Sequence, residues 1–83
     1  YKECMSRMQI LSQRWQFKGS AEGAEAQLQE RIKILREFLY WAKKAPLVVA
    51  MNGPFGMDEE EIVKNIQRQI KLLEQQLRDL RRG

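Results

Sequence analysis

The sequence predicts an all-α protein built around an antiparallel helical hairpin, and two aliphatic series are the reason. The first series steps by 3, 4, 3, 4, 3, which places one aliphatic seam along a helix; its members are Val63, Ile66, Ile70, Leu73, Leu77 and Leu80. The second series lies in the middle of the chain with the same kind of spacing and contains Leu28, Ile32, Leu35, Leu39 and Ala42. Because each seam can cover the other, we expect coiled-coil-like packing of two helices.

The N-terminal segment, about residues 1–17, is expected to form a shorter helix. Its apolar residues recur at helical spacing and form a face with more sulfur-containing and aromatic residues than the two aliphatic seams. They are Tyr1, Cys4, Met8, Leu11 and Trp15. Gly19 and Ser20 interrupt this pattern, and Ser20 is a candidate N-cap for the next helix, which begins at about residue 21 or at Ala24. The composition of residues 19–26 also suits an engineered linker, and the sequence leaves that alternative open.

The two long helices have clear ends in the sequence. The helix of about residues 21–44 ends because Pro46 disfavours helical geometry at Ala45. Asp58 is the expected N-cap of a helix over about residues 58–82, with Glu61 three residues later as in a capping box. At about 1.5 Å per residue both helices reach roughly 35 Å, the length match that an antiparallel hairpin needs. Residues 1–83 are therefore expected to form a single helical domain.

The connection over residues 45–57 is unusual because it is apolar and long. It has thirteen residues, whereas helical hairpins commonly use about two to eight. One interpretation is a plug over one end of the bundle, with a turn at Asn52, Gly53 and Pro54. The other is an edge that binds a partner by β-augmentation, because the uncharged run 47–51 has strand propensity.

Few residues in the chain could carry chemistry. There is no His and a single Cys, which argues against a Ser-His or Cys-His nucleophile and against a zinc site. The acidic run 58–61 is explained as a helix start, where carboxylates favour the helix dipole. Cys4 is interpreted as a small buried residue, with a reactive thiol as the alternative. We therefore expect no enzyme activity, no metal and no cofactor.

A second apolar stripe on the middle helix, formed by Ile34, Phe38 and Trp41, lies beside its aliphatic seam. The N-terminal helix could cover this stripe and complete a three-helix bundle, or the stripe could contact a partner. The residues predicted as candidates for partner binding, including those of the apolar connection, are Trp15, Ile34, Phe38, Trp41, Leu47, Val48, Val49 and Phe55. A chain of 83 residues has a marginal core. The leading interpretation is therefore a protein interaction, oligomerisation or scaffold module that forms a homo-oligomer or needs an obligate partner.

The net charge of +4, from 15 Lys and Arg against 11 Asp and Glu, supports a second interpretation. A basic helical domain can bind or package nucleic acid through phosphate contacts. The candidate residues for such contacts are Lys43, Lys44, Arg78, Arg81 and Arg82. Acids and bases are interspersed along both long helices, however, and bases near the last turn of a helix also complement its dipole.

Compartment and chain extent are expectations from composition alone. A single thiol suits a reducing compartment, and no stretch resembles a signal peptide or a membrane span. We expect an intracellular protein of the cytoplasm or nucleus without a membrane partner. Because the chain begins at Tyr1 rather than Met, we also expect a fragment of a longer protein.

Overall fold

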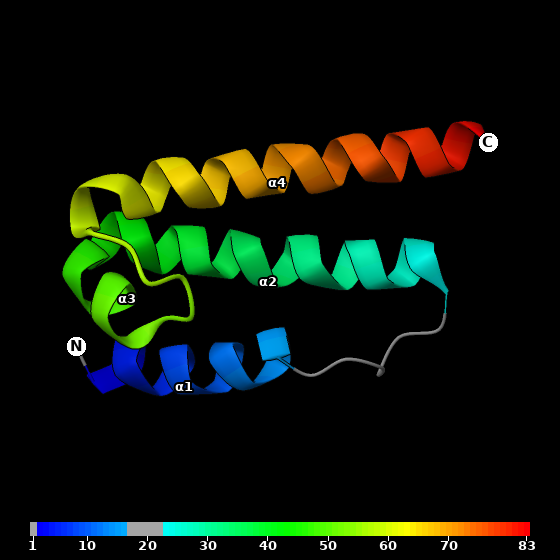
Figure 1. Cartoon of the computed structure of the whole chain (residues 1–83). Helices are drawn as coiled ribbons and strands as arrows, with labels where there is room; N and C mark the ends of the chain where they lie inside the picture. The colour runs from blue at the N-terminus through cyan, green and yellow to red at the C-terminus, as the bar shows by residue number, and fades with distance from the viewer. Residues whose placement is uncertain (1, 17–22) are drawn as a thin grey trace.

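The computed structural model describes residues 2–16 and 23–83, and these form four α-helices (Figure 1). In chain order they are α1 (Lys2–Gln16), α2 (Ala24–Lys44), α3 (Pro46–Asn52) and α4 (Glu59–Arg82). The predicted all-α fold is confirmed, and the described residues contain no strand. α2 begins at Ala24 after Gly23, whose φ of 81° favours glycine. The predicted N-cap at Ser20 lies outside the described residues. Residues 19–22 of the stretch 19–26, for which an engineered linker is the alternative, lie outside them as well.

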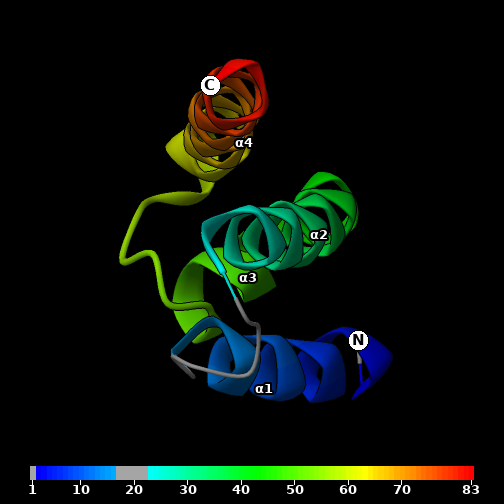
Figure 2. The same cartoon turned by 90° about the vertical axis from the view of Figure 1, so that its right-hand side faces the viewer.

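The helices are arranged in layers, with α2 between α4 and α1. α2 runs antiparallel to both of them (Figure 1), and the end-on view places it in the middle (Figure 2). α4 packs on α2 and α3, and α1 packs on the same two helices. Within the described part of the chain, no α-carbon of α1 lies within 8 Å of one of α4. α2 therefore needs apolar residues on two sides, as its two stripes provide.

The second stripe of α2 is covered from within the chain. Ile34 is 4% exposed and Phe38 is fully buried, and both belong to one core with Cys4, Met8 and Leu11 of α1. The interpretation that the N-terminal helix folds over this stripe is the one that the structure supports. The short helix α3 joins the same core and makes the bundle one of four helices rather than three.

The apolar connection contains the helix α3, so of its two interpretations the strand-like edge is wrong. Pro46 occupies the first turn of α3, where its missing N–H and fixed φ are tolerated. Ala45 and Val49 lie one helical turn apart and are both buried, so the side of the segment that carries them faces the core. The side-chain amide of Asn52 donates to the Val48 carbonyl oxygen at 3.0 Å. Burial of this helical face outweighs the β-propensity of its residues.

The start of α4 agrees with the predicted position but not with the predicted bonds. Asp58 is the N-cap residue, with φ −70° and ψ 154°. Its side chain makes no capping hydrogen bond, and its backbone carbonyl instead accepts from the N–H groups of Glu61 and Ile62, both at 3.1 Å. The predicted capping box is therefore wrong, while the dipole argument for acidic residues in this first turn still applies.

Burial along the predicted α4 seam is uneven. Ile66 and Ile70 are buried, the three residues Val63, Leu73 and Leu77 are half-buried, and Leu80 is 45% exposed. Ile62, which precedes the seam, is fully buried. A straight α-helix drifts relative to a 3.5-residue repeat, and α3 adds a second surface for α4 to pack on. The most buried line on α4 is therefore Ile62, Ile66 and Ile70.

A charged cluster joins α1 to α2. Both oxygens of the Glu37 carboxylate accept hydrogen bonds from Arg7, each at 2.6 Å. The indole Nε1–H of Trp41 donates to the same carboxylate at 3.2 Å. The hydrogen bonds from Arg7, rather than burial, dominate and lower the pKa of Glu37 below its ordinary value of 4.5. Glu37 therefore orients α1 on α2 most strongly when it is ionised.

We expect Glu37→Gln to destabilise the protein near pH 7 and to lose that effect in acid. Because the pKa of Glu37 is lowered in the folded state, its contribution is complete above 4.5 and disappears as the pH falls through the folded-state pKa. Urea unfolding at several pH values measures the difference between wild type and variant. The control Glu30→Gln removes an exposed carboxylate of the same helix. A difference for Glu37→Gln that stays constant down to about pH 2 contradicts the assignment.

Candidate functional site

The residues predicted to bind a partner are largely used in the protein's own core. Phe38 and Val49 are fully buried, and Ile34 is nearly so. Four others are half-buried: Trp15, Trp41, Val48 and Phe55. Only Leu47, at 53% exposed, lies openly on the surface. The three buried members of this set could reach a partner only if the bundle opened.

Three of these residues form an internal aromatic cluster. The ring centroids of Phe38 and Phe55 lie 5.0 Å apart with an edge-to-face arrangement, and Trp15 lies 6.5 Å from Phe38 and 5.9 Å from Phe55. The guanidinium of Arg31 stacks 4.4 Å from the centroid of the Trp15 ring. Such geometry stabilises the junction of α1, α2 and the loop after α3. The aromatic residues therefore hold the bundle together.

The residues predicted to contact nucleic acid do not form one surface. Lys43 and Lys44 lie in the last turn of α2, and Arg81 and Arg82 lie in the last turn of α4. Because α2 and α4 are antiparallel, these two groups are at opposite ends of the hairpin (Figure 1). Arg78 and Arg81 instead line a different feature, a groove between the two long helices.

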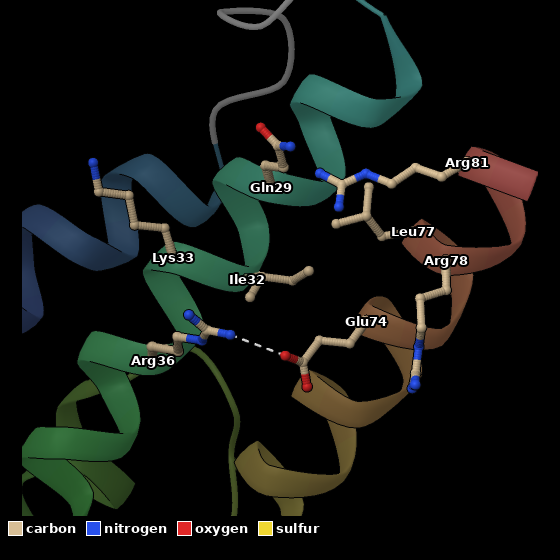
Figure 3. A pocket seen from close by; sticks show the side chains of 8 residues that line it. All are labelled: Gln29, Ile32, Lys33, Arg36, Glu74, Leu77, Arg78 and Arg81. Atoms are coloured by element: carbon tan, nitrogen blue, oxygen red, sulfur yellow. Dashed lines mark hydrogen bonds and ion pairs between the residues drawn. The ribbon is translucent and has the colours of Figure 1, made fainter.

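The candidate site is an open groove along one side of the α2 and α4 pair, here named the α2/α4 groove. It consists of two hollows of about 710 and 600 Å³ that meet at Glu74. The first hollow is shown in Figure 3 and is lined by Gln29, Ile32, Lys33, Arg36, Glu74, Leu77, Arg78 and Arg81. The second is lined mainly by α4, with Leu39, Lys64, Gln67, Arg68, Ile70, Lys71 and Glu74.

The floor of the α2/α4 groove is aliphatic. Ile32 of α2 and Leu77 of α4 extend toward each other between the helices (Figure 3). Ile32 is 6% exposed, and Leu77 is half-buried. Leu39 and Ile70 provide the aliphatic part of the second hollow. A strip of this kind between two long helices is a surface on which the apolar face of a third helix can pack.

The rim of the groove is basic. Seven Lys or Arg residues line it, four in the first hollow and three in the second, against the single acid Glu74. The lining residues thus carry +6, more than the +4 of the whole chain. Arg36 pairs with Glu74 at 2.9 Å and Arg81 with Glu25 at 2.7 Å. The other five bases make no ion pair with any described residue; they are Lys33, Lys64, Arg68, Lys71 and Arg78.

Most of the basic rim is absent from the residues predicted as sites, although α4 carries a signal for it. The residues that directly follow the six seam residues form a stripe with four bases and one acid: Lys64, Gln67, Lys71, Glu74, Arg78 and Arg81. The residues that directly precede the seam carry one acid and no base: Ile62, Asn65, Gln69, Leu72, Gln76 and Asp79. This difference between the two edges of one seam is readable from spacing alone. That Arg36 of α2 joins the same side is a tertiary result, whereas Lys33 lines the hollow with its ammonium group directed away from α4 (Figure 3).

Neither a metal-binding cluster nor an exposed thiol is found among the described residues. No group of three His, Cys, Asp or Glu side chains among them could hold a metal ion. Cys4 is 2% exposed, and burial raises the pKa of its thiol, so it is protonated near neutral pH and matches the interpretation as a small buried residue. The helices in the described part of the chain are too short or too polar to span a membrane.

Comparisons of the chain with models of protein families, with curated proteins and with solved structures found no match.

Proposed function

We propose that the chain is a non-enzymatic protein-interaction module and that the α2/α4 groove is its binding surface. The observation that supports this proposal is the pair of hollows between two long helices, each with aliphatic lining residues and a basic rim. Among the described helices, α2 and α4 pack against each other most extensively. A groove on such elements keeps its shape without a partner, which reduces the entropic cost of binding.

Two ion pairs across the groove support its preorganisation. Arg36 of α2 is bonded to Glu74 of α4, and Arg81 of α4 is bonded to Glu25 of α2. Their side chains are 38 to 64% exposed, so each pair contributes little to overall stability. Their effect is local: they connect the walls of the first hollow where no described part of α1 or α3 packs on α4's C-terminal half (Figure 1).

A partner other than a second copy suits the groove better. In a two-fold symmetric contact the same patch occupies both sides of the interface. The seven bases of one groove would then face the seven bases of the other, and like charges brought together in an interface are unfavourable. The stripe of Ile34 and Phe38, one reason to expect self-association, is already buried. We therefore propose a heterotypic partner for this surface.

We expect an uncharged amphipathic helical peptide to bind in the groove. The probe is a peptide of about 20 residues with leucine at alternating steps of 3 and 4 and glutamine at most other positions. Amide chemical shifts in ¹H–¹⁵N spectra of the whole chain should change along residues 29–36 and 74–81, the walls of the first hollow. Changes confined to other residues, or none at all, would refute the proposed binding surface.

A matched pair of variants on α4 sharpens this test. Leu77→Gln places a polar group in the floor of the groove and should weaken peptide binding severalfold. Leu72→Gln makes the same change at a residue that is 57% exposed on the opposite edge of α4, and it should leave binding within about twofold of wild type. Circular dichroism of both variants checks that the helices are retained.

A further inference from the structure

We infer that the natural occupant of the α2/α4 groove is an acidic amphipathic helix of a protein partner. This inference rests on the proposed function and adds the chemistry of the partner. Five of the seven rim bases have no acidic partner among the described residues. Carboxylates of a docked helix would supply the missing charges, and charge complementarity of this kind selects partners and speeds their association.

The floor of the groove distinguishes a helix from a nucleic acid. Ile32 and Leu77 present aliphatic groups where the two walls meet (Figure 3), and a phosphate backbone has no apolar side to place there. Proteins that bind single strands usually stack the bases on aromatic side chains. None of the residues that line the groove is aromatic. An occupant with carboxylates on its edge and aliphatic groups on its face fits both the floor and the rim.

The spacing of the rim bases fits a helical ligand. Lys64, Lys71 and Arg78 follow one another at seven-residue intervals on α4, which is about 10.5 Å per step along the helix axis. A partner helix that lies along the groove and carries a carboxylate at every seventh residue has the same axial spacing, so its carboxylates can face these bases. From Lys64 to Arg81 the rim extends over 18 residues of α4, and the rise between these two residues is about 26 Å. A partner helix of about five turns would cover it.

The experiment compares two peptides that differ only in charge. One is the glutamine-rich amphipathic peptide described above, and the other has glutamate at seven-residue intervals along one edge of its leucine face. Fluorescence anisotropy with the whole chain should give a dissociation constant about tenfold lower for the acidic peptide at low salt, since several weak surface pairs add together. This advantage should shrink as salt is raised.

Charge reversal of the protein tests where the acidic peptide binds. Arg78→Glu changes an unpaired base of the rim and should weaken binding of the acidic peptide about fivefold or more, with little effect on the neutral peptide. The control Arg14→Glu makes the same charge change on α1, which contributes no lining residue, and should alter binding less than twofold. Equal losses for the two variants would show that only net charge matters and would overturn the inference.

The remaining outcomes separate this inference from the proposed function. If both peptides bind in the groove with equal affinity, the acidic partner is wrong while the binding surface stands. If neither peptide binds, the proposed function fails as well. A short DNA duplex or a single-stranded oligonucleotide serves as the competing probe. If either binds more tightly than the acidic peptide and loses that binding in Arg78→Glu, the groove is a nucleic-acid surface and the inference is overturned.

Discussion

Replacing Phe38 by alanine is expected to lower the free energy of unfolding by about 3–5 kcal/mol. Phe38 is fully buried, and its ring packs against Trp15 and Phe55, so the variant loses contacts with α1 and with the loop after α3 at once. The total stability of a small domain is about 5–15 kcal/mol. Chemical denaturation followed by circular dichroism measures this change.

The same substitution tests whether the second stripe of α2 belongs to the core. Tyr40→Ala is the control, because Tyr40 is an aromatic residue of the same helix that is 50% exposed; its cost should not exceed about 1 kcal/mol. Equal stabilities of the two variants would mean that α1 does not cover the stripe. Phe38 would then be available to a partner, as the alternative interpretation of the sequence holds.

Ile66→Ala is expected to cost about 2–5 kcal/mol, whereas Leu80→Ala should cost no more than about 1 kcal/mol. Both residues belong to the regular aliphatic series of α4, yet Ile66 is fully buried and Leu80 is 45% exposed. The cost of removing methyl groups depends on the cavity that remains, and an exposed site leaves none. Urea unfolding of the two variants gives the comparison.

The polar control for this pair is Gln75→Ala, an exposed change on α4 that should shift stability by no more than about 0.5 kcal/mol. Similar losses for Ile66→Ala and Leu80→Ala would show that the whole series is packed equally and that the gradient of burial along α4 is wrong. A small loss for Ile66→Ala would question the packing of α4 on α2 itself.

The sequence by itself determined the class of the fold and most of its helix boundaries. Two aliphatic series of matching length require two helices that cover each other, because each leaves one continuous apolar side. Pro46 ends one helix, and Asp58 begins the last. These features depend on local geometry and on the 3.6-residue period, which neighbouring residues carry without help from the rest of the chain.

The role of the run 47–51 was decided by tertiary structure. Its residues have strand propensity, and an isolated segment could adopt either state. In the fold, Val49 enters the core formed with α1, α2 and α4, and burial of one helical side is worth more than the intrinsic preference of five residues. The alternative interpretation of this run as a β-edge is wrong because intrinsic propensity is a weak term when a core is available.

The α2/α4 groove also depended on tertiary structure. Along the two long helices acids and bases are interspersed, as on the solvated surface of ordinary helices. Packing α2 antiparallel to α4 brings Arg36 to the side of α4 that carries Lys71 and Arg78, and Glu74 is the one acid among the residues that line the groove. Which charged residues share a surface depends on which edges of the two helices lie side by side. This arrangement is fixed by packing between residues about 40 positions apart, such as Arg36 and Glu74.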